Sequence, residues 1–182
     1  MREAIAPLSL YFATPSHSKW FIFLPIDINC LPNNSTNVVA SDDFYILGIL
    51  TSKIHRLWVK AQSSTLKGDT RYTHNSCFET FPFPQTPAPE TVAQIRTTAK
   101  ELHRYRSEQM EAKQWGITQL YNKFFDEPAS QLAKIHARLD ELVIEAYGFA
   151  PQNDILEKLL ELNRELAQRE KRGETVIGAW VP

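Results

Sequence analysis

Four prolines lie within ten residues near the middle of the chain, in the segment FPFPQTPAPE at residues 81–90. Proline fixes φ and has no backbone N–H, so neither a helix nor a central strand continues through such a segment. A stretch of this composition is typical of a stiff connector. We therefore expect the 182-residue chain to divide at about residue 85, into a domain at 1–85 and a helical region at 86–182.

Apolar residues recur at helical spacing after the prolines. One series starts at Val92 and a second at Leu132, and the link between them is rich in aromatic residues. A third series begins near Asp154, whose spacing from Glu157 is that of an N-terminal cap, and it ends near Gly173. The pattern predicts a C-terminal helical bundle, followed by an apolar tail that needs a partner.

The part before the prolines calls for mixed structure. KWFIFLPI, residues 19–26, is rich in β-forming residues and predicts a strand. SDDFYILGILTSKIHRLWVKAQ, residues 41–62, predicts one helix capped by Ser41, with an apolar stripe that packs on a small sheet. The expected fold class is therefore α+β, a small mixed N-terminal recognition domain followed by a C-terminal helical bundle.

Positive charge is concentrated in one place. The formal net charge is -1, so any contact with nucleic acid has to come from a local patch. Residues 51–75 carry five Lys or Arg and one Asp, a local charge of +4 (5 - 1). Three of these cations, Lys53, Arg56 and Lys60, follow one face of the predicted helix, where they would neutralise phosphates or simply face solvent.

The segment SSTLKGDTRYTH, residues 63–74, places Lys67 and Asp69 on either side of Gly68. In an extended segment their side chains point to the same side, as does that of Arg71. A lysine that reaches guanine and an aspartate that accepts from the paired cytosine would together read one G·C pair. A local salt bridge on an exposed loop explains the same pair equally well.

The sequence contains no known catalytic or cofactor motif. It has no (N/D/S)PP(Y/F) loop, no glycine-rich turn for S-adenosylmethionine, no PD...(D/E)xK pattern, and no GxxxxGK(S/T), GxSxG or HExxH. We therefore expect no catalytic residue, metal or cofactor in this chain. His55 and His74 could act as acid and base, but we interpret His55 as touching phosphate or solvent, and Cys77 as a small buried filler.

The apolar runs are too short to span a membrane, and Cys30 and Cys77 do not suggest a disulfide framework. We expect a reduced, cytoplasmic protein.

Four stretches of the sequence act together as a signature. They are GILTSxxHxxW at 48–58, LKxDxRYT at 66–73, NxxxxxFPFP at 75–84 and HARLDELVIEAYGF at 136–149. This set resembles the target recognition domain of type IIG and type IIL restriction-modification enzymes and of related DNA adenine-N6 methyltransferases. TPSHSKWFIFLP, at 14–25, resembles the family's upstream P-R-x-S-K/S element. There Ser16 stands where many relatives carry arginine, and His17 or Lys19 would take its place.

The resemblance implies a sequence-specific DNA recognition module that is not catalytic by itself. Its partners would be double-stranded DNA and a methyltransferase domain of the parent chain. That domain would bind S-adenosylmethionine, with or without an endonuclease in the same parent chain. The implied base-reading residues are Lys67, Asp69 and Arg71, although Arg71 and Tyr72 could instead orient the reading loop. The implied contacts to the DNA backbone are Lys53, Arg56, Lys60, Ser63, Ser64, His17, Lys19 and His74.

The residues alone leave an alternative open, a non-catalytic protein-interaction module whose basic helix face meets an acidic protein surface.

Overall fold

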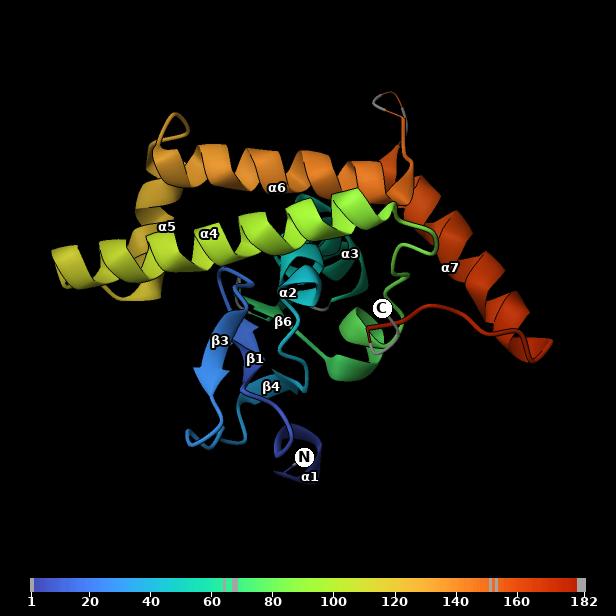
Figure 1. The fold of residues 1–182 in the computed structure, drawn as a ribbon, viewed down its shortest axis with the longest axis horizontal. Helices are drawn as coiled ribbons and strands as arrows, with labels where there is room; N and C mark the ends of the chain where they lie inside the picture. Colours follow the sequence, from blue (N-terminus) through green and yellow to red (C-terminus); the bar gives the residue numbers. More distant parts are fainter. Residues whose placement is uncertain (1, 64, 67–68, 151, 153, 180–182) are drawn as a thin grey trace.

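The computed structural model describes residues 2–63, 65, 66, 69–150, 152 and 154–179, without the side chains of Arg2, Thr65, Leu66, Asp69, Thr70 and Phe125. Small sheets are combined with long helices, so the predicted α+β class is confirmed (Figure 1). No described helix is long and apolar enough to cross a membrane. In chain order the elements are α1 (Arg2–Ile5), β1 (Leu10–Pro15), β2 (His17–Ser18), β3 (Leu24–Asp27), β4 (Thr36–Val39), α2 (Phe44–Thr51), α3 (Lys53–Gln62), β5 (Thr65–Leu66), β6 (Asp69–Arg71), a π-helical turn (His74–Phe78), α4 (Pro89–Lys113), α5 (Ile117–Asp126), α6 (Gln131–Tyr147) and α7 (Ile155–Lys171).

The described strands form two antiparallel sheets of three strands each. In the first, β1 lies between β3 and β4, and Phe12 pairs with Pro25 on one side and Val39 on the other. In the second, β6 lies between β2 and β5. The strand predicted over residues 19–26 is mostly wrong, because only β3 at its end is a strand. Ile22 and Phe23 are consecutive and both buried, which the alternation of a one-sided strand does not allow.

The single helix predicted over residues 41–62 is in fact two helices that meet at Ser52. This residue is extended, with φ -66° and ψ 160°. Its hydroxyl accepts a hydrogen bond from the His55 N–H at 3.3 Å and donates to the Ile49 carbonyl at 2.7 Å. The hydroxyl thus caps α3 and replaces helical bonds lost at the break. The cap of α2 is Asp43 and not Ser41, since its carboxylate accepts from the Tyr45 N–H at 2.9 Å.

Replacement of the Ser52 hydroxyl tests this account of the helix break. We expect Ser52→Ala to lower the free energy of unfolding by about 1 kcal/mol, because alanine cannot cap α3. Ser52→Gly serves as the comparison, since glycine is tolerated at an N-cap position and should cost only a few tenths of that amount. Urea unfolding measures both changes. Equal stability of the alanine variant and the unaltered chain would show that the cap is unimportant.

The helices predicted after the prolines are confirmed. α4 and α6 lie side by side along one edge of the molecule, and α7 leaves at an angle to them (Figure 1). α6 ends at Gly148, which has φ 66°, and the Asp154 carboxylate caps α7 by accepting from two backbone N–H groups at 3.0 and 3.1 Å. The aromatic link between the first two predicted helices contains a further helix, α5, which the sequence did not predict.

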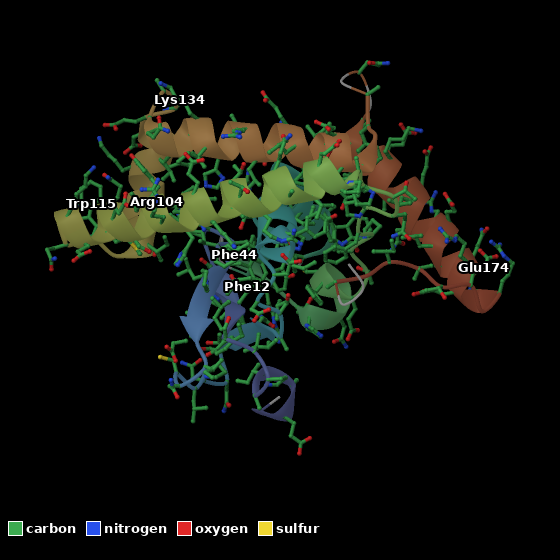
Figure 2. All side chains as sticks on the ribbon, viewed as in Figure 1. Phe12, Phe44, Arg104, Trp115, Lys134 and Glu174 are labelled. Carbon is green, nitrogen blue, oxygen red and sulfur yellow. The ribbon has the colours of Figure 1, made fainter. Side chains whose placement is uncertain are left out.

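One hydrophobic core extends across the proline-rich segment. It includes Phe12 from β1, Leu47 from α2, Ile95 from α4 and Leu139 from α6. Figure 2 shows Phe12 and Phe44 where the sheet meets the helices, whereas Arg104, Lys134 and Glu174 point outward. The division at residue 85 stays a prediction, and the two sides of it share this core.

Helices α2 and α4 pack tightly against each other at Gly48. A Cβ placed on this residue would lie 2.5 Å from Ile95 Cγ2 and 3.3 Å from Leu139 Cδ1. Glycine is therefore required here for close packing of the helices and not for an unusual φ.

The chain after α7 returns toward the proline-rich segment (Figure 1). The Gln85 side chain donates from Nε2 to the Ile177 carbonyl at 2.9 Å and accepts from the Ile177 N–H at 3.0 Å. Ala179 is buried and belongs to the core. The described part of the apolar tail, which was expected to need a partner, is thus paired with the segment that separates the two halves.

Candidate nucleic-acid interface

The imidazole of His55 is fully buried at the centre of the N-terminal part. Its Nδ1 lies 2.8 Å from the Leu50 carbonyl, and its Nε2 lies 3.3 Å from the Tyr72 hydroxyl. A carbonyl only accepts, so Nδ1 carries the proton and Nε2 accepts from Tyr72. Burial lowers the pKa of His55 to about 4, and the imidazole is therefore neutral at pH 7. The interpretation that His55 touches phosphate or solvent is wrong.

Three stretches of the sequence signature meet at this imidazole. His55 belongs to the first, Tyr72 to the second, and Phe81 of the third lies with its ring centroid 4.7 Å from that of His55. Cys77 is also buried nearby, which confirms its prediction as a filler. These three stretches occur together in the sequence because their side chains pack around one buried imidazole. This imidazole lies beneath the segment expected to read DNA.

Arg71 and Tyr72, whose roles were left open, are placed differently. Tyr72 is buried, and its N–H donates to the Ser16 carbonyl at 2.9 Å. Arg71 is exposed and lies opposite His17 in the pairing of β2 with β6. Tyr72 thus orients the segment by packing, whereas the Arg71 side chain is presented to the outside.

A polar hollow of about 450 Å³ lies beside Arg71. Its other lining residues include His74, whose ring stacks on Phe78 with centroids 5.2 Å apart and whose Nε2 is 3.4 Å from Glu79 Oε1. Hydroxyl and amide groups supply most of the remaining wall. The full lining is Ser16, Asn37, Arg71, Tyr72, Thr73, His74, Asn75 and Ser76.

Lys67, Gly68 and Ser64 lie outside the described residues, as does the side chain of Asp69. The strands around them are described, and Leu66 of β5 is the antiparallel partner of Asp69 in β6. β5 and β6 thus run in opposite directions, and we call the junction between these two strands the β5–β6 reversal. The expectation of one extended segment from Lys67 to Arg71 includes residues outside the described ones, and it stays a prediction.

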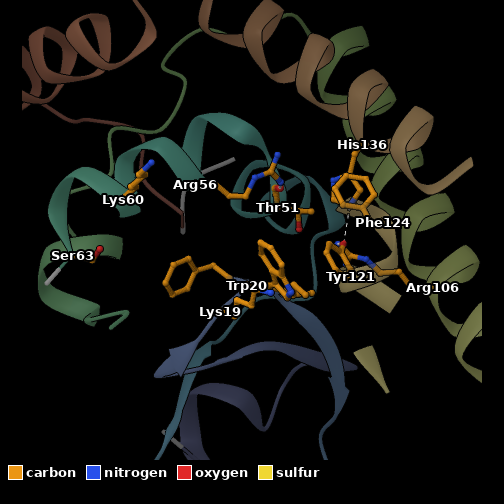
Figure 3. A pocket seen from close by; sticks show the side chains of 12 residues that line it. Lys19, Trp20, Thr51, Arg56, Lys60, Ser63, Arg106, Tyr121, Phe124 and His136 are labelled. Carbon is orange, nitrogen blue, oxygen red and sulfur yellow. Dashed lines mark hydrogen bonds between the residues drawn. The ribbon is translucent and has the colours of Figure 1, made fainter. Parts of the chain in front are cut away.

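Four of the predicted backbone-binding residues line one cavity of about 550 Å³. They are Lys19, Arg56, Lys60 and Ser63, and Figure 3 shows them around the same space. Lys19 directly follows β2, and Ser63 lies between α3 and β5. Arg56 and Lys60 belong to α3. Lys53 is exposed but does not line the cavity. Its backbone N–H donates to Asp140 Oδ1 at 2.6 Å.

Arg56 is the most constrained of these cations. Its Nη1 donates to the Thr51 carbonyl at 2.6 Å, and its Nη2 lies 3.4 Å from Asp140 Oδ2. Burial raises the pKa of Asp140, although Arg56 opposes that rise. Lys60 is exposed and makes no ion pair with any described residue. Lys60 is therefore the freer of the two to meet an external anion.

The helical region also contributes to this cavity, through residues that the sequence analysis missed. They are Arg106 from α4, Tyr121 from α5 and His136 from α6. One signal was present, because Arg106 follows Ile95, Ala99 and Leu102 on the buried stripe of α4. A charged residue on an apolar stripe indicates a buried site.

The fold and this surface together define a class, an α+β module that presents cations and hydrogen-bonding side chains around two hollows. Among the described residues, no three His, Cys, Asp or Glu side chains are grouped so as to hold a metal ion. Residues 13–85 match the family model of the MmeI target recognition domain. Over these residues the chain is therefore similar to the MmeI target recognition domain, which agrees with the resemblance that the sequence signature indicated.

Two relatives extend this result. DNA methyltransferase A of Bacillus subtilis (strain 168) is 33% identical over 143 residues, which are 75% of this chain and 15% of that protein. The type IIL restriction-modification enzyme MmeI, solved in complex with DNA, shares the fold with a TM-score of 0.67 at 22% identity. That match covers 88% of this chain and 22% of the MmeI chain. The chain therefore spans less than a quarter of either relative.

Proposed function

We propose that this chain is the sequence-reading DNA module of a DNA adenine-N6 methyltransferase or restriction-modification enzyme, and is not catalytic by itself. The observation that carries the proposal is the meeting of Lys19, Arg56, Lys60 and Ser63 at one cavity within the segment matched by the target recognition family. Cations and short hydroxyl side chains are the groups that contact phosphates and set register on a duplex.

The two relatives, one named a DNA methyltransferase and the other solved with DNA, support the same proposal. The parent polypeptide would bind S-adenosylmethionine in a methyltransferase domain and rotate an adenine out of the duplex for methylation. It would act in the bacterial cytoplasm, with or without DNA cleavage. This chain would choose the site.

Sequence reading is assigned to the β5–β6 reversal. Lys67 and Asp69 would read one G·C pair, the lysine from guanine and the aspartate from cytosine. Arg71, exposed beside the fixed Tyr72, would contact a neighbouring base. His17, opposite Arg71, and His74, in the same hollow, would join Lys53, Lys60 and Ser64 at the phosphates.

Selection from random duplexes tests these assignments. The unaltered chain should enrich one motif, and the double variant Lys67→Ala/Asp69→Ala should lose preference at one position by a factor of about ten to a hundred. Lys60→Ala should weaken binding to all sequences alike and reduce the slope of log K against log salt by about 1. Lys134→Ala, on the outer side of α6 (Figure 2), is the matched control and should change neither quantity.

An unchanged motif in the double variant would contradict the reading role. No retention of DNA at low salt would instead favour the protein-interaction alternative.

A further inference from the structure

The cavity beside the second sheet has more features than contacts to a DNA backbone require. Its volume of about 550 Å³ lies in the range of small-ligand sites, about 300 to 1,000 Å³. Segment 19–22 forms one wall, residues from Thr51 to Ser63 a second, and helices α4, α5 and α6 a third (Figure 3). The described lining contains four Lys or Arg and no Asp or Glu.

The deepest of these cations is Arg106, only 1% exposed. Its Nη2 donates to the Tyr121 hydroxyl, and its Nη1 lies 3.4 Å from the Phe23 carbonyl. No described carboxylate lies within ion-pairing distance of it. A buried cation without a counter-charge is unfavourable. The fold therefore keeps a positive charge that an anionic ligand would neutralise.

Several buried polar atoms at the cavity have no partner among the described residues. The Tyr121 hydroxyl accepts from Arg106 and so donates its own proton to His136 Nε2, at 2.7 Å. The His136 proton is then on Nδ1, which is unpartnered. Thr51 Oγ1, Ser63 Oγ and Arg106 Nε are unpartnered as well. All four atoms are able to donate, so this set of groups suits a ligand that is rich in acceptors.

Aromatic rings complete the wall. Trp20 is held by α5, because its Nε1 donates to Asn122 Oδ1 at 3.0 Å, and the Lys19 ammonium lies 4.7 Å from the Trp20 ring. Phe21 and Phe124 also line the space. Such a wall accepts a planar ring by stacking, with no requirement for one base over another. A planar, acceptor-rich ring joined to an anion is the chemistry of a nucleotide.

We propose that this cavity binds a single nucleotide outside the base stack, with its ring at Trp20 and its phosphate at Lys19 and Lys60. The inference rests on the proposed function, since DNA would supply the nucleotide. A free mononucleotide has the same chemistry, and the two sources are distinguished by experiment. Thr51, Arg106 and His136 line the same cavity, and their donor groups favour an acceptor-rich ligand.

Tryptophan labelled with fluorine gives a local readout of binding to the 182-residue chain. The Trp20 resonance, assigned with Trp20→Phe, should shift on addition of dAMP, and those of Trp58 and Trp115 should stay in place. Inorganic phosphate and acetate should shift it less at equal concentration. If acetate matches dAMP, the cavity is a general anion site and the nucleotide assignment is wrong.

Binding to duplexes shows whether DNA or a free mononucleotide is the source of the bound nucleotide. A duplex with one bulged nucleotide should bind about tenfold more tightly than its fully paired counterpart, and Trp20→Leu should abolish that difference. Lys60→Glu should also remove this difference while it weakens binding to both duplexes, and it does not depend on the folding of a buried variant such as Arg106→Met. Lys134→Glu is the matched surface control. A shift with dAMP and no preference for the bulge would assign the cavity to free mononucleotides.

Selective binding to paired duplexes without any response to bulge or dAMP would overturn this inference and leave the proposed function intact. Loss of all duplex binding would overturn the proposed function instead.

Discussion

Gly48→Val is expected to lower the free energy of unfolding by about 3 kcal/mol. The cause is overpacking between α2 and α4, since the Cβ alone would lie 2.5 Å from Ile95 Cγ2. That methyl is attached directly to a branched Cβ and cannot swing aside as the end of a long side chain does. Relief would require α4 to move, and α4 is packed on α6 as well. Chemical unfolding followed by circular dichroism gives the value.

Two further variants isolate the cause. Gly178→Val is the control, because a Cβ at Gly178 has no atom within 4 Å, and it should cost little. Ile95→Leu removes the Cγ2 methyl at nearly constant volume, so it should restore part of the stability lost in Gly48→Val. A double variant that is no more stable than Gly48→Val alone would rule out the Ile95 contact as the source.

Acidification is expected to destabilise the protein through His55. Burial lowers its folded pKa to about 4 from the ordinary 6.5, so between these values the unfolded chain binds a proton that the folded chain excludes. Stability is therefore unaffected by this group above pH 6.5 and falls as the pH drops toward 4. The full loss is about 3 kcal/mol.

The pH dependence of His55→Gln separates this group from the others. Burial also lowers the pKa of His136, so the unaltered chain retains a second contribution of the same sign. The variant should be less stable at pH 7, because Gln does not fill the site between Leu50 and Tyr72, and its stability should fall less between pH 6.5 and 4. Parallel curves for the two proteins would contradict the assignment to His55.

Periodicity and capping predicted the helical half because those signals are local. The stripes of α4, α6 and α7 and the Asp154 cap are read from residues three and four apart. Ser52 shows the limit, since a serine within an apolar series fits a helix interior and a helix break equally well. Only the hydroxyl bonds to Ile49 and His55 decide between them.

The site was predicted in part for a similar reason. Lys19, Arg56 and Lys60 were chosen for their charge, and three of the chosen cations do meet at one cavity. His55 was misjudged because a histidine among basic residues has the same pattern whether it faces solvent or Tyr72. Arg106 and His136 could not be assigned to this cavity, because they reach it from helices distant in sequence.

The contact of Gly48 with Ile95 has a consequence for how such proteins diversify. A hybrid that joined residues 13–85 of one relative to the helices of another would have to match a glycine against a β-branched side chain across the junction. Exchange of whole segments is therefore constrained by steric fit, whereas point changes at Arg71 or the β5–β6 reversal leave that fit untouched. Under the proposed function, new specificities should therefore arise more readily by single substitutions than by recombination.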